Sequence, residues 1–171
     1  MTGAVVWIFG LPSAGKSTLA GILAARLRAG GAAVLVLDGD DVRLALDPAP
    51  GFDEVSRVAF YRTLARLAAL AARQGIVAVV AATSNRRVHR AEARRHWPGL
   101  LEVFVDVPLA ECERRDAKGL FAKARRGEAP GLPGVGDPFE RPEAPDLRAT
   151  GGDDPSVAAE VLRRLRAIRL A

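Results

Sequence analysis

A glycine-rich segment near the start of the chain limits its possible folds more than any other feature. Residues 10–18 read Gly-Leu-Pro-Ser-Ala-Gly-Lys-Ser-Thr, which matches the phosphate-binding pattern G-x-x-x-x-G-K-[ST]. The apolar run Ala4–Phe9 before it is typical of a buried strand, and the composition from Lys16 to about Ala29 favours a helix. A strand and a helix in this order let backbone N–H groups surround a phosphate at the helix N-terminus. A chance glycine-rich turn is the alternative, and this context argues against it.

The loop residues have separate expected roles in binding a nucleoside triphosphate. Lys16 is placed to reach the β- and γ-phosphates, and the Ser17 hydroxyl is placed to ligate Mg²⁺. The donor-nucleotide site is therefore predicted to contain Gly10, Ser13, Ala14, Gly15, Lys16, Ser17 and Thr18.

Predicted strands and helices alternate along the rest of the chain. Strands are expected at Ala4–Phe9, Val34–Leu37, Ile76–Ala82 and Glu102–Val107, and helices at about 16–29, 54–73, 87–96, 109–115 and 155–168. Asp154 is the expected N-cap of the last helix, with Pro155 at its first position. This order predicts a doubly wound α/β domain. Together with the phosphate loop, it gives the expected fold class: a P-loop NTPase with three α/β/α layers around a mainly parallel sheet of four to five strands.

Most prolines and many glycines lie in one segment, approximately residues 116–150. Such a long irregular segment inside a compact domain is a functional lid or disordered, and its mixture of charged and apolar residues favours a lid. Lys118, Lys123, Arg125 and Phe139 are expected to have little to pack against without nucleotides, so the lid is predicted to be mobile until they bind. The whole chain, 1–171, is expected to form a single P-loop domain that includes this lid.

Composition excludes several classes of protein. The single cysteine, Cys112, excludes an internal disulfide and a cysteine-cluster zinc site, and two histidines are too few for a histidine metal centre. No apolar run approaches the ~18 residues of a membrane span, and the N-terminus lacks the basic region of a signal peptide, so a cytoplasmic protein is expected. Although the net charge is +5, the basic residues are scattered and paired with few aromatics, which argues against nucleic-acid binding.

A second group of polar residues, 37–43, reads Leu-Asp-Gly-Asp-Asp-Val-Arg and follows the second predicted strand. We expect a polar turn at 38–41, at the carboxyl edge of the sheet, where α/β proteins bind ligands. One carboxylate there can accept the proton of an attacking hydroxyl, and another can support a magnesium ion. Asp-Gly-Asp is also a common turn, but the nearby phosphate loop and the following Arg43 favour the functional interpretation.

Taken together, these motifs resemble the adenylylsulfate (APS) kinase family. The resemblance spans essentially the whole chain and rests on the phosphate loop and on residues 37–43, 51–52, 103–109, 112–113, 115–116, 118–121, 123–125, 127–128 and 142–145. The Lys-Gly-Leu of 118–120 and the Pro-Glu-Ala-Pro of 142–145 are the specific parts. The resemblance implies transfer of the ATP γ-phosphoryl group to the 3′-hydroxyl of APS, giving PAPS and ADP, with Mg²⁺ as cofactor and a homodimer as the assembly.

The resemblance also implies a role for individual residues. Lys16, Asp40 and Asp38 would be catalytic, Ser17 and Asp38 would hold the metal, and Arg115 would join the donor site. The acceptor would be bound by Arg43, Phe52, Arg57, Ser84, Lys118 and Leu132, with Phe52 stacking on its adenine. The lid would contribute Lys118, Lys123 and Arg125. For three of these residues a purely structural role stays open as the alternative: Phe52 as a core residue, Arg57 as an exposed helix residue and Ser84 as a helix cap.

The chain departs from the family on the acceptor side alone. Thr83-Ser84-Asn85-Arg86-Arg87 replaces Ile-Ser-Pro-Tyr-Arg, Phe60 replaces an asparagine, and the lid aromatic is lost around Leu132 and Pro133. Loss of an aromatic pair would weaken acceptor binding about three- to tenfold. A phosphotransferase with another nucleotide or small-molecule acceptor therefore remains an alternative, followed by a polynucleotide kinase and a non-catalytic nucleotide-binding regulator.

Overall fold

The computed structural model describes residues 3–116 and 118–170, with side chains for 3–116 and 118–167. Its strands are β1 Ala4–Phe9, β2 Val34–Asp38, β3 Val77–Ala81, β4 Leu101–Val105 and β5 Leu147–Ala149. Its helices are α1 Lys16–Ala29, α2 Gly39–Ala45, α3 Glu54–Arg73, α4 Arg87–His96, α5 Leu109–Arg115, α6 Leu120–Arg125 and α7 Pro155–Leu170. Ala117, inside the predicted lid, lies outside the described residues.

The five strands form one parallel sheet in the order β2-β3-β1-β4-β5. Strand β1 lies between β3 and β4, so the chain winds first to one side of β1 and then to the other. The loop after β1 therefore lies at the point where the strand order reverses, which is where open α/β sheets bind ligands. The predicted fold class is confirmed, with five strands.

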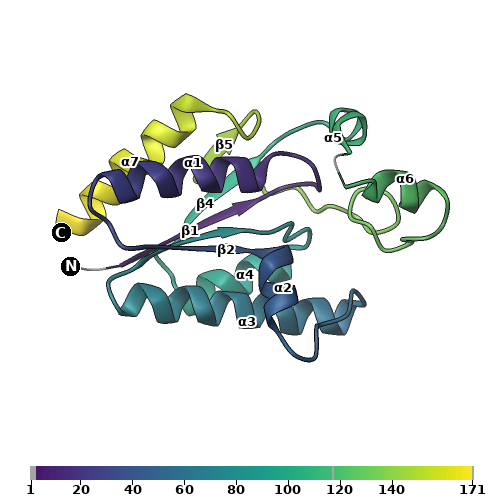
Figure 1. Ribbon diagram of the computed structural model, residues 1–171, viewed down its shortest axis with the longest axis horizontal. Coiled ribbons are helices and arrows are strands. Elements are labelled where there is room, and N and C mark those ends of the chain that lie inside the picture. Colours follow the sequence, from purple (N-terminus) through teal and green to yellow (C-terminus); the bar gives the residue numbers. More distant parts are fainter. Residues whose placement is uncertain (1–2, 117, 171) are drawn as a thin grey trace.

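Helices cover both faces of the sheet, with α1 and α7 on one side and α2, α3 and α4 on the other (Figure 1). All six residues of β1 are buried, and their side chains alternate between the two faces. Val6 and Ile8 pack in the core beneath α1 and α7, whereas Trp7 and Phe9 pack in the core beneath α3. This double coverage explains why the central strands read as continuous apolar runs.

The polar residues after β2 differ from the prediction, because they begin a helix rather than form a turn. Asp38 is the N-cap of α2, and its side chain accepts the backbone N–H of Asp40 at 3.0 Å. An aspartate at this position satisfies a donor that the first helical turn leaves free. The N-cap thus points a carboxylate along the same edge as the phosphate loop. The predicted cap of α7 is confirmed, since Asp154 accepts the N–H of Val157.

The segment from Asp116 to Thr150 also contains regular structure that the prediction missed. It includes α6 and the edge strand β5, which pairs with β4. Phe139 was expected to lack packing partners, and this is wrong: its ring stacks on Phe104 with centroids 5.8 Å apart. Phe121 and Leu132 are buried in the core as well. Proline and glycine composition predicted the loops correctly but carried no information about these long-range contacts.

None of the described helices combines the length and apolar composition that crossing a membrane requires.

Candidate active site

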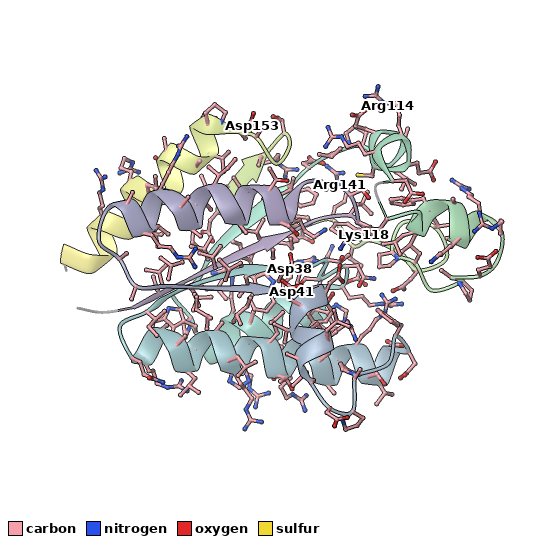
Figure 2. All side chains as sticks on the ribbon, viewed as in Figure 1. Asp38, Asp41, Arg114, Lys118, Arg141 and Asp153 are labelled. Atoms are coloured by element: carbon pink, nitrogen blue, oxygen red, sulfur yellow. The ribbon has the colours of Figure 1, made fainter. Side chains whose placement is uncertain are left out.

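A cleft of about 900 Å³ opens at the carboxyl edge of the sheet. Figure 2 places Asp38 beside α2 and Lys118 on the segment before α6, and both residues line this cleft. Lining residues that the sequence predicted are Ser13, Gly15, Lys16, Ser17, Thr18, Asp38, Asp40, Arg43, Phe52, Arg57, Arg115, Lys118 and Leu132. The fold thus brings nearly all predicted donor-side and acceptor-side residues to one opening.

The phosphate loop adopts backbone angles that need glycine at two positions. Gly15, the N-cap of α1, has φ 101°, and Gly10 has φ 155°. A Cβ added at Gly15 would lie 2.6 Å from the backbone nitrogen of Gly152, and one at Gly10 would lie 2.6 Å from the carbonyl oxygen of Val105. Two later segments, the end of β4 and the loop after β5, therefore pack closely against the backbone of the phosphate loop. Ala14 is fully buried beneath it.

Lys16 lies within this loop and donates a hydrogen bond from Nζ to the carbonyl oxygen of Leu11 at 2.7 Å. Burial lowers the pKa of Lys16 to about 8, although the carboxylates of Asp38 and Asp40 act in the opposite direction. A partly buried ammonium group whose one hydrogen-bond partner is a neutral carbonyl lacks a direct counterion. A polyphosphate in the loop would supply the missing negative charge.

Ser17 and Asp38 provide two oxygen ligands that suit a magnesium ion. The Ser17 hydroxyl donates to Asp38 Oδ2 at 2.5 Å, so both oxygens lie at one point beside the phosphate loop. The part of the chain that the structure describes holds no group of three or more acidic, histidine or cysteine ligands. Two protein oxygens fit Mg²⁺, which keeps several waters and takes its other ligands from substrate phosphates.

Asp40 forms an ion pair with Lys118, which reaches it from the segment between α5 and α6. Both side chains remain more than 60% exposed in the cleft, at 63% and 62%. The hydrogen bond to Asp40 raises the pKa of Lys118, so its ammonium group is charged at neutral pH. Three lid cations were predicted: Lys118, Lys123 and Arg125. Within the described residues, Lys118 is the one of them that contacts a carboxylate of the Asp38–Asp40 group.

Arg43 is stacked between two aromatic rings. Its guanidinium carbon lies 3.9 Å from the ring centroid of Phe60 and 4.5 Å from that of Phe52. Its Nη1 donates to the carbonyl oxygens of Pro50 and Gly51 at 3.0 and 2.9 Å. Arg43 therefore supports the loop that presents Phe52, whose side chain is 67% exposed and free to stack on a planar ligand.

Arg57 lines the cleft, but its donors are already bonded within the protein. They reach the carbonyl oxygens of Phe52 and Gly131, both at 2.6 Å, and the carboxylate of Asp137 at 3.3 Å. The same carboxylate accepts from Asn85 and Arg86, two positions where the chain departs from the resembled family. Arg57 is buried rather than an exposed helix residue, and it links the Phe52 loop to the segment after α6.

Five predicted site residues do not line the cleft: Gly10 and Ala14 of the phosphate loop, Ser84, Lys123 and Arg125. Ser84 is fully buried: its Oγ accepts from Trp7 Nε1 at 3.0 Å, and its N–H donates to the Tyr61 hydroxyl at 2.9 Å. The predicted contact between Ser84 and the acceptor is therefore wrong, because the packing of β1 and α3 turns this side chain inward. Lys123 and Arg125 lie on α6 and do not line the cleft, and Arg125 pairs with Glu113 of α5 instead.

The sequence prediction missed several parts of the cleft wall, among them Tyr61 and the loop between β5 and α7. Tyr61 lines the cleft from α3, and residues 150–153 line it from the loop between β5 and α7. A tyrosine within an amphipathic helix looks like a core residue, so no sequence signal distinguishes it. The Gly151-Gly152-Asp153 run after a strand was a detectable signal, since a second glycine loop at the same sheet edge suggests close backbone approach.

Comparisons with known proteins agree on one family. The family profile described as "Adenylylsulphate kinase" matches residues 2–150. The adenylyl-sulfate kinase of Paraburkholderia xenovorans (strain LB400) is 49% identical over 146 residues, which cover 85% of this chain and 82% of that protein.

Solved structures agree with the sequence comparisons. The APS kinase CysC of Mycobacterium tuberculosis, in complex with AMPPNP and APS, superimposes with a TM-score of 0.90 at 40% identity and covers 96% of this chain and 98% of that one. A hexameric APS kinase from Thiobacillus denitrificans has a TM-score of 0.70 at 28% identity, covering 97% of this chain and 29% of that one.

Proposed function

This chain belongs to the adenylylsulphate kinase family, and we propose that its cleft transfers the γ-phosphoryl group of ATP to the 3′-hydroxyl of adenosine 5′-phosphosulfate. The observation that carries the proposal is the meeting of the phosphate loop with Asp38, Asp40 and Lys118 in one opening. The products are PAPS and ADP. The reaction belongs to sulfate activation, and we place it in the cytoplasm, where ATP is available.

The donor is bound through the phosphate loop. Backbone N–H groups at the start of α1 and the Lys16 ammonium group face the β- and γ-phosphates, and burial makes that charge effective. Ser17 and Asp38 would hold the Mg²⁺, with its remaining ligands from phosphate and water. When bound, the ion offsets the negative charge of the β- and γ-phosphates. Arg115 borders the same part of the cleft and is the proposed contact to the donor's nucleoside.

Asp40 is the proposed base for the acceptor hydroxyl. The 3′-oxygen forms a bond to the γ-phosphorus, the bond from that phosphorus to the β–γ bridging oxygen breaks, and the hydroxyl proton passes to Asp40. Lys16 and Lys118 stabilise the charge that moves onto the ADP leaving group and the transferred oxygens. Lys118 must release Asp40 for this step, since the two side chains pair in the structure.

The acceptor is bound between the Phe52 loop and the segment after α6. Phe52 stacks on its adenine, and Leu132 covers the same wall of the cleft. Arg43 and Arg57 supply positive charge near the phosphosulfate, although their present hydrogen bonds shape the loops around it. We propose that the lid, residues 116–150, closes over both nucleotides with Lys118 at its inner edge, and that Lys123 and Arg125 act from its outer side.

A substrate panel tests the function. ADP formation is measured with APS, AMP, adenosine, shikimate and a single-stranded oligonucleotide as acceptors, and mass spectrometry identifies the product. We expect APS-dependent ADP formation and a product carrying one additional phosphate on the ribose. Turnover with another acceptor and none with APS would contradict the proposal, and absence of turnover with all of them would favour a regulator. We also propose that two copies associate, which light scattering tests as a mass twice the 18.1 kDa of one chain.

A further inference from the structure

Tyr61 is a residue of the cleft wall whose ring is fixed by packing on two sides. Its ring stacks on His89 with centroids 4.2 Å apart and meets the edge of Phe60 at 5.5 Å. The residue is 5% exposed, yet it contributes to the lining of the cleft. A ring packed on two sides cannot turn its polar end elsewhere.

The hydroxyl of Tyr61 uses only part of its hydrogen-bonding capacity. Its oxygen accepts the backbone N–H of Ser84 at 2.9 Å. A phenol also has one proton to donate, and no acceptor for it is found among residues 3–116 and 118–167. Burial raises the pKa of Tyr61, so this proton is present at neutral pH.

The partner that fixes the hydroxyl is itself immobilised. Ser84 has a left-handed backbone with φ 42°, which is uncommon for a residue other than glycine. Its Oγ accepts from Trp7 Nε1, and its carbonyl oxygen accepts from Arg90 Nη1 at 2.7 Å. Because the backbone of Ser84 is held in place, its N–H occupies one lone pair of the Tyr61 oxygen and leaves the phenolic proton available to a ligand.

The surroundings of this hydroxyl are predominantly positive. The charges of Arg43 and Arg57 act on the Tyr61 phenol more strongly than the charge of Asp40 does. Arg43 Nη1 and two nitrogens of Arg57 donate to backbone carbonyl oxygens, so part of the donor capacity of both arginines is already used within the protein. The Tyr61 hydroxyl adds an uncharged donor with a free proton, which can bind an anionic oxygen there.

We propose that Tyr61 is a specificity-determining residue whose hydroxyl donates a hydrogen bond to an oxygen of the acceptor's phosphosulfate group. The inference rests on the proposed function, and it assigns this role to a residue of α3 between the Phe52 loop and β3. The hydroxyl contributes to acceptor binding and makes no contact with the donor nucleotide.

The first test replaces Tyr61→Phe, which keeps the ring and removes the proton donor. We expect the KM for APS to rise about tenfold, the scale of one hydrogen bond to a charged group, with the KM for ATP changed less than twofold. The loss of an acceptor for the Ser84 N–H would lower the Tm, so thermal unfolding is measured in parallel. An unchanged KM for APS, or an equal rise in both KM values, would overturn the proposal.

A second test separates donation from the structural bond. Tyr61 is the only tyrosine in the sequence, so biosynthetic incorporation of 3-fluorotyrosine alters this phenol alone. Fluorine makes the phenol a stronger donor and a weaker acceptor. We expect a lower KM for APS together with a slightly lower Tm, and a ¹⁹F resonance that shifts with APS but not with ADP. A resonance insensitive to APS would reject the contact, whereas a wild-type enzyme that forms no ADP with APS would reject the proposed function instead.

Discussion

The ammonium group of Lys118 forms an ion pair with the carboxylate of Asp40 across 78 residues of sequence. Lys118 precedes α6 and Asp40 lies in the first turn of α2, so the contact joins the lid segment to the proposed catalytic base. An exposed pair of this kind contributes little to stability. Its importance is positional, because a γ-phosphate entering between the two groups would take over the lysine and free the carboxylate.

Replacement of Asp40→Asn tests the base. The amide keeps the size of the side chain but cannot accept the hydroxyl proton, so we expect kcat to fall roughly 10²-fold or more. ATP binding should change much less. The neighbouring substitution Asp41→Asn is the matched control, since Asp41 is exposed and does not line the cleft. Equal turnover by the wild type and Asp40→Asn would show that Asp40 is not the base and serves only at the start of α2.

Replacement of Lys16→Ala tests the donor site. Lys16 stabilises charge that exists only on a bound polyphosphate, so we expect phosphoryl transfer to be abolished while the fold is retained. Circular dichroism and Tm verify the fold, and the coupled ADP assay measures the rate. A variant that keeps more than about a tenth of the wild-type rate would refute this role.

The pKa of Lys16, lowered to about 8, predicts a pH dependence of donor binding. Below pH 8 the side chain is an ammonium ion that attracts phosphate, and above it the neutral amine no longer does. We therefore expect kcat/KM for ATP to decrease as the pH rises through about 8, and nucleotide binding near that pH to take up a proton. Calorimetric titrations in two buffers of different ionisation enthalpy count that proton. Identical binding heats in both buffers would contradict the prediction.

Acid stability should depend on His89, a buried residue stacked on Tyr61. Burial and the nearby charges of Arg57, Arg86 and Arg90 lower its pKa from 6.5 to about 4. Below pH 6.5 His89 is protonated in the unfolded chain but stays neutral in the folded chain until the pH approaches 4. The free energy of unfolding therefore falls between pH 6.5 and about 4, by at most about 1.4 kcal/mol per pH unit. Chemical denaturation at several pH values measures the slope.

A matched pair of variants tests whether His89 causes this decrease of the unfolding free energy in acid. The chain has two histidines, so His96→Gln should keep the acid slope while His89→Gln reduces it. The slope would belong to other groups if both variants behaved like the wild type.

Limited trypsin digestion tests the lid. Arg125 and Arg126 are exposed at the end of α6, and we expect cleavage there in the nucleotide-free protein. Closure excludes water and protects the donor from hydrolysis, so both nucleotides together should suppress cleavage more than either one alone. If protection is the same with and without nucleotides, the segment is a fixed part of the fold.

Local patterns in the sequence were sufficient for the framework of the protein. The phosphate loop, the buried strands and the cap at Asp154 depend on neighbours within a few residues, because strand burial, helix capping and glycine angles are short-range properties. For that reason the order of the elements and the phosphate loop between β1 and α1 could be predicted. Asp38 and Asp40 were also found correctly at the sheet edge, although as a turn rather than the start of α2.

Tertiary structure alone decided how the acceptor side is built. Ser84 turns inward to Trp7, Tyr61 turns toward the cleft, and Arg57 is bound to Gly131 and Asp137, more than 70 residues away in sequence. Strand β5 likewise exists because β4 offers it an unpaired edge. These outcomes depend on which surfaces meet after the chain has folded. The residues next to a side chain in sequence do not determine these contacts, because burial and hydrogen bonding depend on residues brought together from distant segments.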